Sequence, residues 1–103
     1  QNTTGNDNIA SGYAALIRSN TGSSNVASGD YALYELTEGS LNTAIGHNTG
    51  RGITTGDYNT ILGANVTGLS GDLSNNIIIA DGLSFIRIDL NKFLLPKPSM
   101  GFI

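Results

Sequence analysis

Asparagine recurs every 17 residues in this chain, at positions 8, 25, 42, 59 and 76. The carboxamide of asparagine both donates and accepts hydrogen bonds, so stacked asparagines can bond to one another in a continuous column. The flanking residues repeat as well, because residues 39–46 and 56–63 both read Gly-x-x-Asn-Thr-x-x-Gly. We therefore expect the side chains to form a structural ladder of amides, built from Asn8, Asn25, Asn42, Asn59 and Asn76.

Residues that commonly carry catalysis or hold metals are scarce. His47 is the one histidine, and the sequence contains no cysteine. A histidine without a thiol, a second histidine or a fixed carboxylate partner does not assemble a catalytic triad or a metal site. The glycine-rich motifs that cradle phosphate do not occur. We therefore predict no catalytic residue, no cofactor and no metal, and interpret the chain as a non-enzyme.

Aromatic and basic side chains lie in the less regular half of the repeats. Exposed tyrosine and arginine are residue types that often anchor interfaces. The candidates for contact with a receptor are Tyr13, Tyr31, Tyr34, His47 and Arg51. Packing between chains, or plain exposure, is the alternative interpretation of the same residues.

The glycines that bracket each asparagine predict the fold class. Glycine reaches positive φ without steric cost and suits tight bends, so the chain is expected to change direction every eight or nine residues. Seventeen residues then suffice for two short strands and two bends, which make one coil of a β-solenoid or β-roll. We predict an all-β, parallel solenoid of five 17-residue coils over residues 1–89. Residues 90–103 are expected to form an exit strand and a capping or interchain tail.

The second half of the repeat varies from copy to copy. The first two copies carry alanine, leucine and tyrosine there and could pack against another surface. The third and fourth copies contain glycines there and are expected to be solvent-facing loops. In the fifth copy Leu73 and Ala80 replace two of the glycines, so the coil should widen or end there. Residues 77–79 and 85–90 are expected to be two longer strands. The apolar tail after them should be covered by another chain or domain.

Charge and hydropathy exclude several classes of partner. The net charge is −3 at pH 7, and the five lysines and arginines are scattered along the chain, so no basic surface for nucleic acid is expected. No run of 18 apolar residues is present, which argues against membrane insertion. Aliphatic residues at a fixed phase argue against disorder, although the composition is rich in glycine, asparagine, threonine and serine.

A single chain of this kind is expected to need further copies of itself to complete its core. A chain of 103 residues encloses only a thin core, and both ends of a stack expose unpaired strand edges. We therefore expect three copies to pack around a common axis. Small residues at the sixth position of the repeat are the expected points of close contact, namely Ala10, Ala27 and Ala44, followed by Ile61 and Ile78.

The repeat resembles known fibrous proteins. The run from Asn42 to Gly63 is similar to the repeats of tail fibres and tailspikes of tailed phages, and residues 76–88 resemble the element that often follows those repeats. The same motif is similar to the head repeat of trimeric autotransporter adhesins, which form left-handed parallel β-rolls in trimers. Together the resemblances cover residues 5–90, and they imply a left-handed coil in a homotrimer.

This resemblance implies a function in host attachment. The chain would be a structural segment of a trimeric phage tail fibre or tailspike in the virion, acting as a shaft that can display receptor-contacting loops. Its partners would be two further copies of itself, other fibre domains and a host surface receptor, either a glycan or an outer-membrane component. The alternative is the head domain of a trimeric adhesin on the bacterial cell surface.

Overall fold

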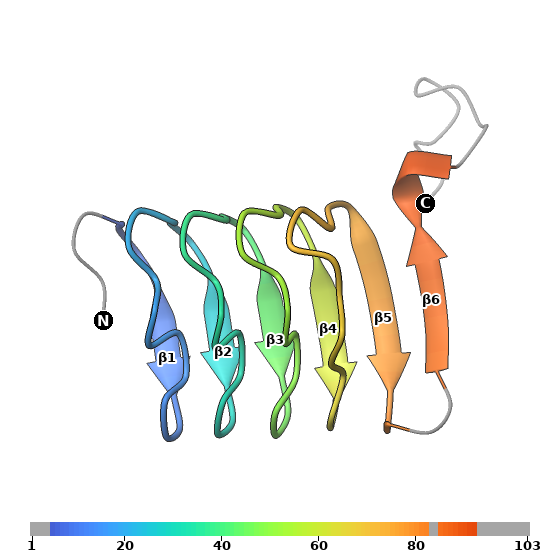
Figure 1. Cartoon of the computed structure of the whole chain (residues 1–103), viewed down its shortest axis with the longest axis horizontal. Helices are drawn as coiled ribbons and strands as arrows, with labels where there is room; N and C mark the ends of the chain where they lie inside the picture. Colours follow the sequence, from blue (N-terminus) through green and yellow to red (C-terminus); the bar gives the residue numbers. More distant parts are fainter. Residues whose placement is uncertain (1–4, 83–84, 93–103) are drawn as a thin grey trace.

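The computed structural model describes residues 5–82 and 85–92. The described residues form strands and one short 3₁₀ helix. The elements are β1 (Ile9–Ser11), β2 (Val26–Ser28), β3 (Thr43–Ile45), β4 (Thr60–Gly63), β5 (Asn76–Ala80), β6 (Phe85–Asp89) and the helix η1 (Leu90–Lys92). The six strands lie side by side in one sheet, in the order of the chain (Figure 1).

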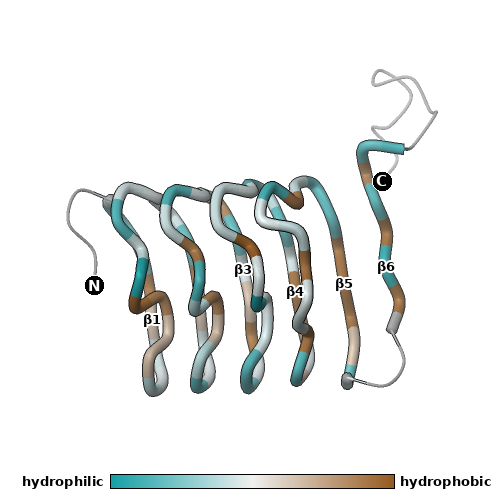
Figure 2. Tube along the Cα trace, viewed as in Figure 1, coloured by the Kyte–Doolittle hydropathy of each residue, from teal (hydrophilic) through white to brown (hydrophobic). Residues whose placement is uncertain are grey.

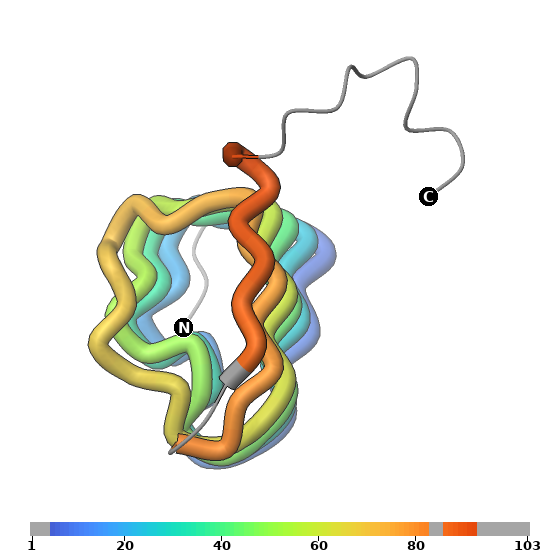
Figure 3. The backbone as a smooth tube through the Cα atoms, turned by 90° about the vertical axis from the view of Figure 1, so that its right-hand side faces the viewer, coloured from blue at the N-terminus to red at the C-terminus, as the bar shows by residue number. Residues whose placement is uncertain are grey.

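Strands β1 to β5 are parallel, and each pairs with the strand 17 residues later without a shift in register. Ala10 pairs with Ala27, Ala27 with Ala44, Ala44 with Ile61, and Ile61 with Ile78. The predicted all-β parallel solenoid with 17-residue coils is therefore confirmed. We call each coil a rung, and a view along the stack shows the rungs overlying one another around a shared interior (Figure 3).

The sixth position of the repeat faces the interior of the coil. Ala27, Ala44, Ile61 and Ile78 are buried within a single chain, whereas Ala10, in the first described strand, is exposed. The expectation that this column makes contacts between chains is therefore wrong for the four buried residues. Small or branched apolar residues suit a narrow coil interior as well as a close contact between chains, and the alternation of side chains along each strand places them inside.

Each of the first four rungs contains one strand, so the predicted second strand is wrong for these rungs. The connecting segments bend through left-handed residues at the same place in successive rungs, which are Ala14, Tyr31, Asn48 and Asn65, with φ between 55° and 64°. A strand cannot continue through such a conformation. Backbone bonds between rungs persist there, for example from the Tyr31 N–H to the Tyr13 carbonyl at 2.8 Å.

Apolar residues of the connecting segments complete the core. Leu33, Leu36, Ile53 and Val66 are buried and belong to the same hydrophobic cluster as the interior residues of the strands. Figure 2 shows apolar stretches both in strands and in connecting segments along the stack. Because Thr49 in the third repeat and Val66 in the fourth are buried, the expectation of solvent-facing loops there is wrong at these positions.

Glycine is required where one rung lies directly against the next. A Cβ on Gly46, which has a φ of 136°, would lie 2.0 Å from the carbonyl oxygen of Gly63, and one on Gly56 would lie 1.8 Å from that of Leu73. In the fifth repeat, Leu73 and Ala80 occupy the positions that Gly56 and Gly63 hold in the fourth. Beyond β5 no further parallel strand follows in the described residues. The parallel stack ends at β5, and β6 pairs antiparallel to it.

The two longer strands expected near the C-terminal end are confirmed as β5 and β6. Leu90–Lys92 form η1, and the rest of the predicted exit and capping tail, residues 93–103, lies outside the described residues. No helix in the described part of the chain is long and apolar enough to cross a membrane.

Candidate functional site

The repeat asparagines lie in one column where the chain enters each strand. The backbone N–H and the Nδ2 of Asn42 donate to Oδ1 of Asn25 at 2.9 and 3.2 Å. The Oδ1 of Asn42 accepts the same two bonds from Asn59, at 3.1 and 2.9 Å. Its Nδ2 also donates to the Gly56 carbonyl at 2.8 Å. Since Asn42 is fully buried, its amide is satisfied entirely by neighbouring rungs.

The ladder ends differently at its two ends. In the first described rung, the Oδ1 of Asn8 accepts the backbone N–H and the Nδ2 of Asn25 at 2.9 and 3.1 Å. In the last rung, the Oδ1 of Asn76 accepts the Nε of Arg87, in β6, at 2.7 Å. The guanidinium thus takes the place of the next asparagine. The ladder amides hydrogen-bond to one another and hold the rungs in register.

Tyrosine and arginine side chains gather on the connecting segments of the first three rungs. We call this group the tyrosine–arginine strip, and it consists of Tyr13, Arg18, Tyr31, Tyr34, Glu35 and Arg51. The ring centroids of Tyr13 and Tyr31 are 5.5 Å apart with the planes at 72°, and those of Tyr31 and Tyr34 are 5.5 Å apart at 52°. Such edge-to-face and tilted pairs are favourable aromatic arrangements.

Two guanidinium groups lie against the ring of Tyr34. The Cζ of Arg18 lies 5.0 Å from the ring centroid, and the Cζ of Arg51 lies 4.8 Å from it. Arg51 also lies 5.7 Å from the ring centroid of Tyr31. These distances are within the range of cation–π attraction. The strip therefore joins aromatic and cationic groups from three successive rungs.

Glu35 and Arg51 form a two-pronged ion pair. The Nε of Arg51 donates to Oε1 of Glu35 and its second terminal nitrogen donates to Oε2, both at 2.9 Å. The Gly52 N–H donates to Oε1 at 3.0 Å. The hydrogen bond from Arg51 holds the pKa of Glu35 below its usual value against the opposing effect of burial. The same bond raises the pKa of Arg51.

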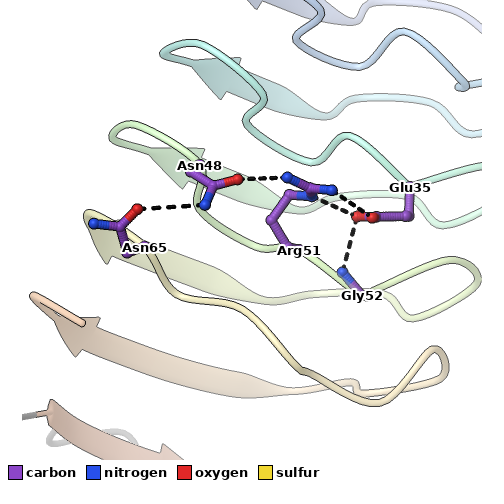
Figure 4. Close-up of polar contacts among 5 residues, drawn as sticks. All are labelled: Glu35, Asn48, Arg51, Gly52 and Asn65. Carbon is purple, nitrogen blue, oxygen red and sulfur yellow. Dashed lines mark hydrogen bonds and ion pairs between the residues drawn. The ribbon is translucent and has the colours of Figure 1, made fainter. Parts of the chain in front are cut away.

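An amide pair extends this network to the next rung. The remaining terminal nitrogen of Arg51 donates to Oδ1 of Asn48, and the Nδ2 of Asn48 donates to Oδ1 of Asn65 at 3.3 Å. Figure 4 shows the continuous series of polar contacts from Glu35 through Arg51 and Asn48 to Asn65. The network thus ties together side chains from the connecting segments of three rungs.

The structure brings together four of the five predicted contact residues, Tyr13, Tyr31, Tyr34 and Arg51. His47 is exposed outside these ring contacts, and its carbonyl accepts the N–H of Asn65. The sequence interpretation missed Arg18 and Glu35. The 17-residue offset could have found them, because it aligns Arg18 with Glu35 and Tyr34 with Arg51.

The strip has the chemistry of a binding surface. It presents flat rings and guanidinium groups, which recognise other molecules through stacking and paired hydrogen bonds. Among the described residues, no group of three or more His, Cys, Asp or Glu side chains could hold a metal ion. A function in recognition therefore suits these side chains.

No family model, curated protein or solved structure matches the chain.

Proposed function

We propose that the chain is a non-enzymatic structural segment of a trimeric phage tail fibre or tailspike that takes part in host attachment. In this proposal three left-handed coils pack around a common axis through the outer faces of their sheets. The connecting segments then face outward. The observation that supports the proposal is a row of exposed apolar side chains on the outer face of the sheet.

On this outer face, the seventh repeat position becomes apolar towards β5. At the seventh repeat position, serine in β1 and β2 gives way to Ile45, Leu62 and Ile79. Ile86 of β6 pairs directly with Ile79 and lies on the same face of the sheet. We call these four residues the outer sheet patch, and they are between 37% and 63% exposed. Large apolar residues aligned on one face are typical of a surface that a partner covers.

A further copy of the chain is the partner that fits the outer sheet patch. Stacking repeats the patch positions along the solenoid axis, so an identical coil with a parallel axis presents the same column at the same spacing. Three copies around a threefold axis cover all three apolar faces and close the assembly. The arrangement also enlarges the thin core that a chain of this length can build alone.

The biological setting follows from the resemblance to phage fibre repeats. The proposed location is the virion, and the proposed further partners are other fibre domains and a glycan or outer-membrane component of the host. The head of a bacterial trimeric surface adhesin is the second candidate. The asparagine ladder in a parallel roll supports both, because both families use this motif.

Two exposed residues of the third rung allow a matched test of the assembly. Ile45 lies in the outer sheet patch and is 46% exposed, whereas Leu41 lies in the bend before the strand and is 45% exposed. In light scattering, the unaltered chain and Leu41→Glu should show three times the mass of the chain. Ile45→Glu should reduce the mass to that of a monomer. An unaltered chain that stays monomeric at high concentration contradicts the proposal.

Immunogold electron microscopy separates the two settings. An antibody against the chain should label the tail appendages of phage particles whose genome encodes the chain. Labelling of the bacterial surface in cells free of phage would instead support the adhesin. Labelling of neither structure would reject both settings.

A further inference from the structure

The tyrosine–arginine strip offers binding groups that the fold does not use. Tyr13 remains 69% exposed although its ring contacts Tyr31. Arg18 is exposed at the other end of the series of ring contacts, where it lies against Tyr34. Among the described residues, no ion pair involves Arg18. An aromatic surface with a cation that lacks an acidic partner is therefore open to solvent.

The two arginines of the strip differ in this respect. The guanidinium of Arg51 is engaged by both carboxylate oxygens of Glu35, and Gly52 supplies a third donor to that carboxylate. Glu35 therefore pairs with Arg51 and leaves Arg18 without an ion pair among the described residues. A second acid, Asp30, lies near the opposite end of the strip, where its Oδ1 accepts the N–H of Tyr13 at 2.8 Å. The positive end of the strip is thus the end at Arg18.

We infer that the strip binds an acidic oligosaccharide, with the guanidinium of Arg18 holding a sugar carboxylate and the tyrosine rings packing against the sugar. A guanidinium matches the planar geometry of a carboxylate through two parallel N–H donors. Pyranose rings have apolar C–H faces that suit flat aromatic side chains. This inference rests on the proposed function in attachment and names the class of receptor. Binding in this way leaves the Glu35–Arg51 pair intact.

The ligand is tested with three probes that separate charge from sugar. A trisaccharide of galacturonic acid carries both features, its methyl ester keeps the sugar without the charge, and citrate keeps carboxylates without sugar. In NMR titrations of the isotope-labelled full chain, the acid should saturate and shift the amide signals of the strip. The ester and citrate should each bind at least about tenfold more weakly. Equal binding of acid and ester would overturn the inference.

The site is tested with variants at exposed positions. Arg18→Gln should weaken binding of the acidic trisaccharide about tenfold, and Tyr13→Ala about threefold to tenfold. Arg18→Lys keeps the charge without the two-pronged geometry and should be intermediate. Lys92→Gln removes one charge from η1, far along the stack, and should change affinity less than about twofold. Unchanged affinity of Arg18→Gln would reject the assignment of the carboxylate to this residue.

Light scattering on the same samples keeps the two proposals apart. A trimer that does not bind the acidic trisaccharide would overturn this inference and leave the proposed assembly standing. A monomer that binds it through Arg18 would support the binding site and contradict the trimer. Circular dichroism of each variant should match that of the unaltered chain, so that lost binding is not lost folding.

Discussion

Each rung has a strand wall, which runs from the bend glycine through the ladder asparagine and the strand (residues 39–46 in the third rung), and a connecting wall, which is the rest of the rung (residues 47–55). The two walls use their side chains differently. In the strand wall, asparagine and glycine recur at fixed positions, because each is in direct contact with its equivalent in the next rung. In the connecting wall, backbone bonds between rungs persist, but the same position can be tyrosine, arginine or glycine, as in Tyr34, Arg51 and Gly68. Side chains that vary without disturbing the stack are free to carry recognition, and the tyrosine–arginine strip lies in this wall.

The largest expected difference between the two walls is the effect of replacing a single glycine by alanine. At Gly46, in the strand wall, a Cβ would meet the Gly63 carbonyl at 2.0 Å, so Gly46→Ala should lower the free energy of unfolding by about 4 kcal/mol. At Gly68, in the connecting wall, φ is 72° and no atom lies within 4 Å of the added Cβ. Gly68→Ala should cost only about 1 kcal/mol. Urea unfolding at equal protein concentration measures both, and equal losses would contradict the distinction.

Asparagine to alanine is the next largest expected effect. Asn42→Ala removes the ladder amide and leaves the buried N–H of Asn59 and the carbonyl of Gly56 without their partners. We expect a loss of about 3 kcal/mol in the free energy of unfolding. Asn65→Ala, at an exposed amide of the connecting wall with a φ of 59°, should cost less, about 1 kcal/mol. If the two variants unfold at the same urea concentration, the ladder does not hold the rungs together.

The strand wall was largely predictable from the sequence because its contacts join identical repeat positions. The spacing of the asparagines gives the register, and the glycines mark where rungs approach. The direction of the sixth position was not predictable, since a small residue such as Ala44 suits a coil interior and an interface equally well. Only the alternation of side chains around a closed coil decides between the two.

The bends of the coil were harder to predict. Leu41 and Tyr58, which precede two ladder asparagines, adopt φ values of 61° and 62°. Bulky residues rarely adopt this conformation, so stacking overrides their local preference. In the strip, the 17-residue offset aligns Tyr34 with Arg51, but the pairing of Arg51 with Glu35 follows from the paths of two side chains and not from the offset.

Replacing a buried hydroxyl in the connecting wall should stabilise the coil. Thr49 is fully buried, and its Oγ1 has no hydrogen-bond partner among the described residues. Thr49→Val keeps the shape and removes the unsatisfied group, so the free energy of unfolding should rise by about 1 kcal/mol. Thr43→Val, on the partly exposed outer face of β3, should change it by less than about 0.5 kcal/mol. A loss of stability in Thr49→Val would mean that the hydroxyl has a partner in solution.

The smallest expected effect concerns the ion pair of the strip. Because the fold lowers the pKa of Glu35 below its ordinary value of 4.5, the pair stabilises the chain fully above that pH. Its contribution is lost as the pH falls below 4.5 through the pKa of the folded chain, while Arg51 stays charged. The Glu35 side chain is 30% exposed, so solvent screening limits the contribution to about 1 kcal/mol or less.

The stability difference between the unaltered chain and Glu35→Gln should therefore shrink as the pH is lowered from neutrality to about 3. In an Arg51→Gln background the same comparison should lose most of its pH dependence, because the main partner that lowers the pKa is gone. A difference that is constant with pH would mean that Glu35 acts through packing alone. The strands should stay paired throughout, since their ladder and backbone bonds involve amides that do not titrate in this range.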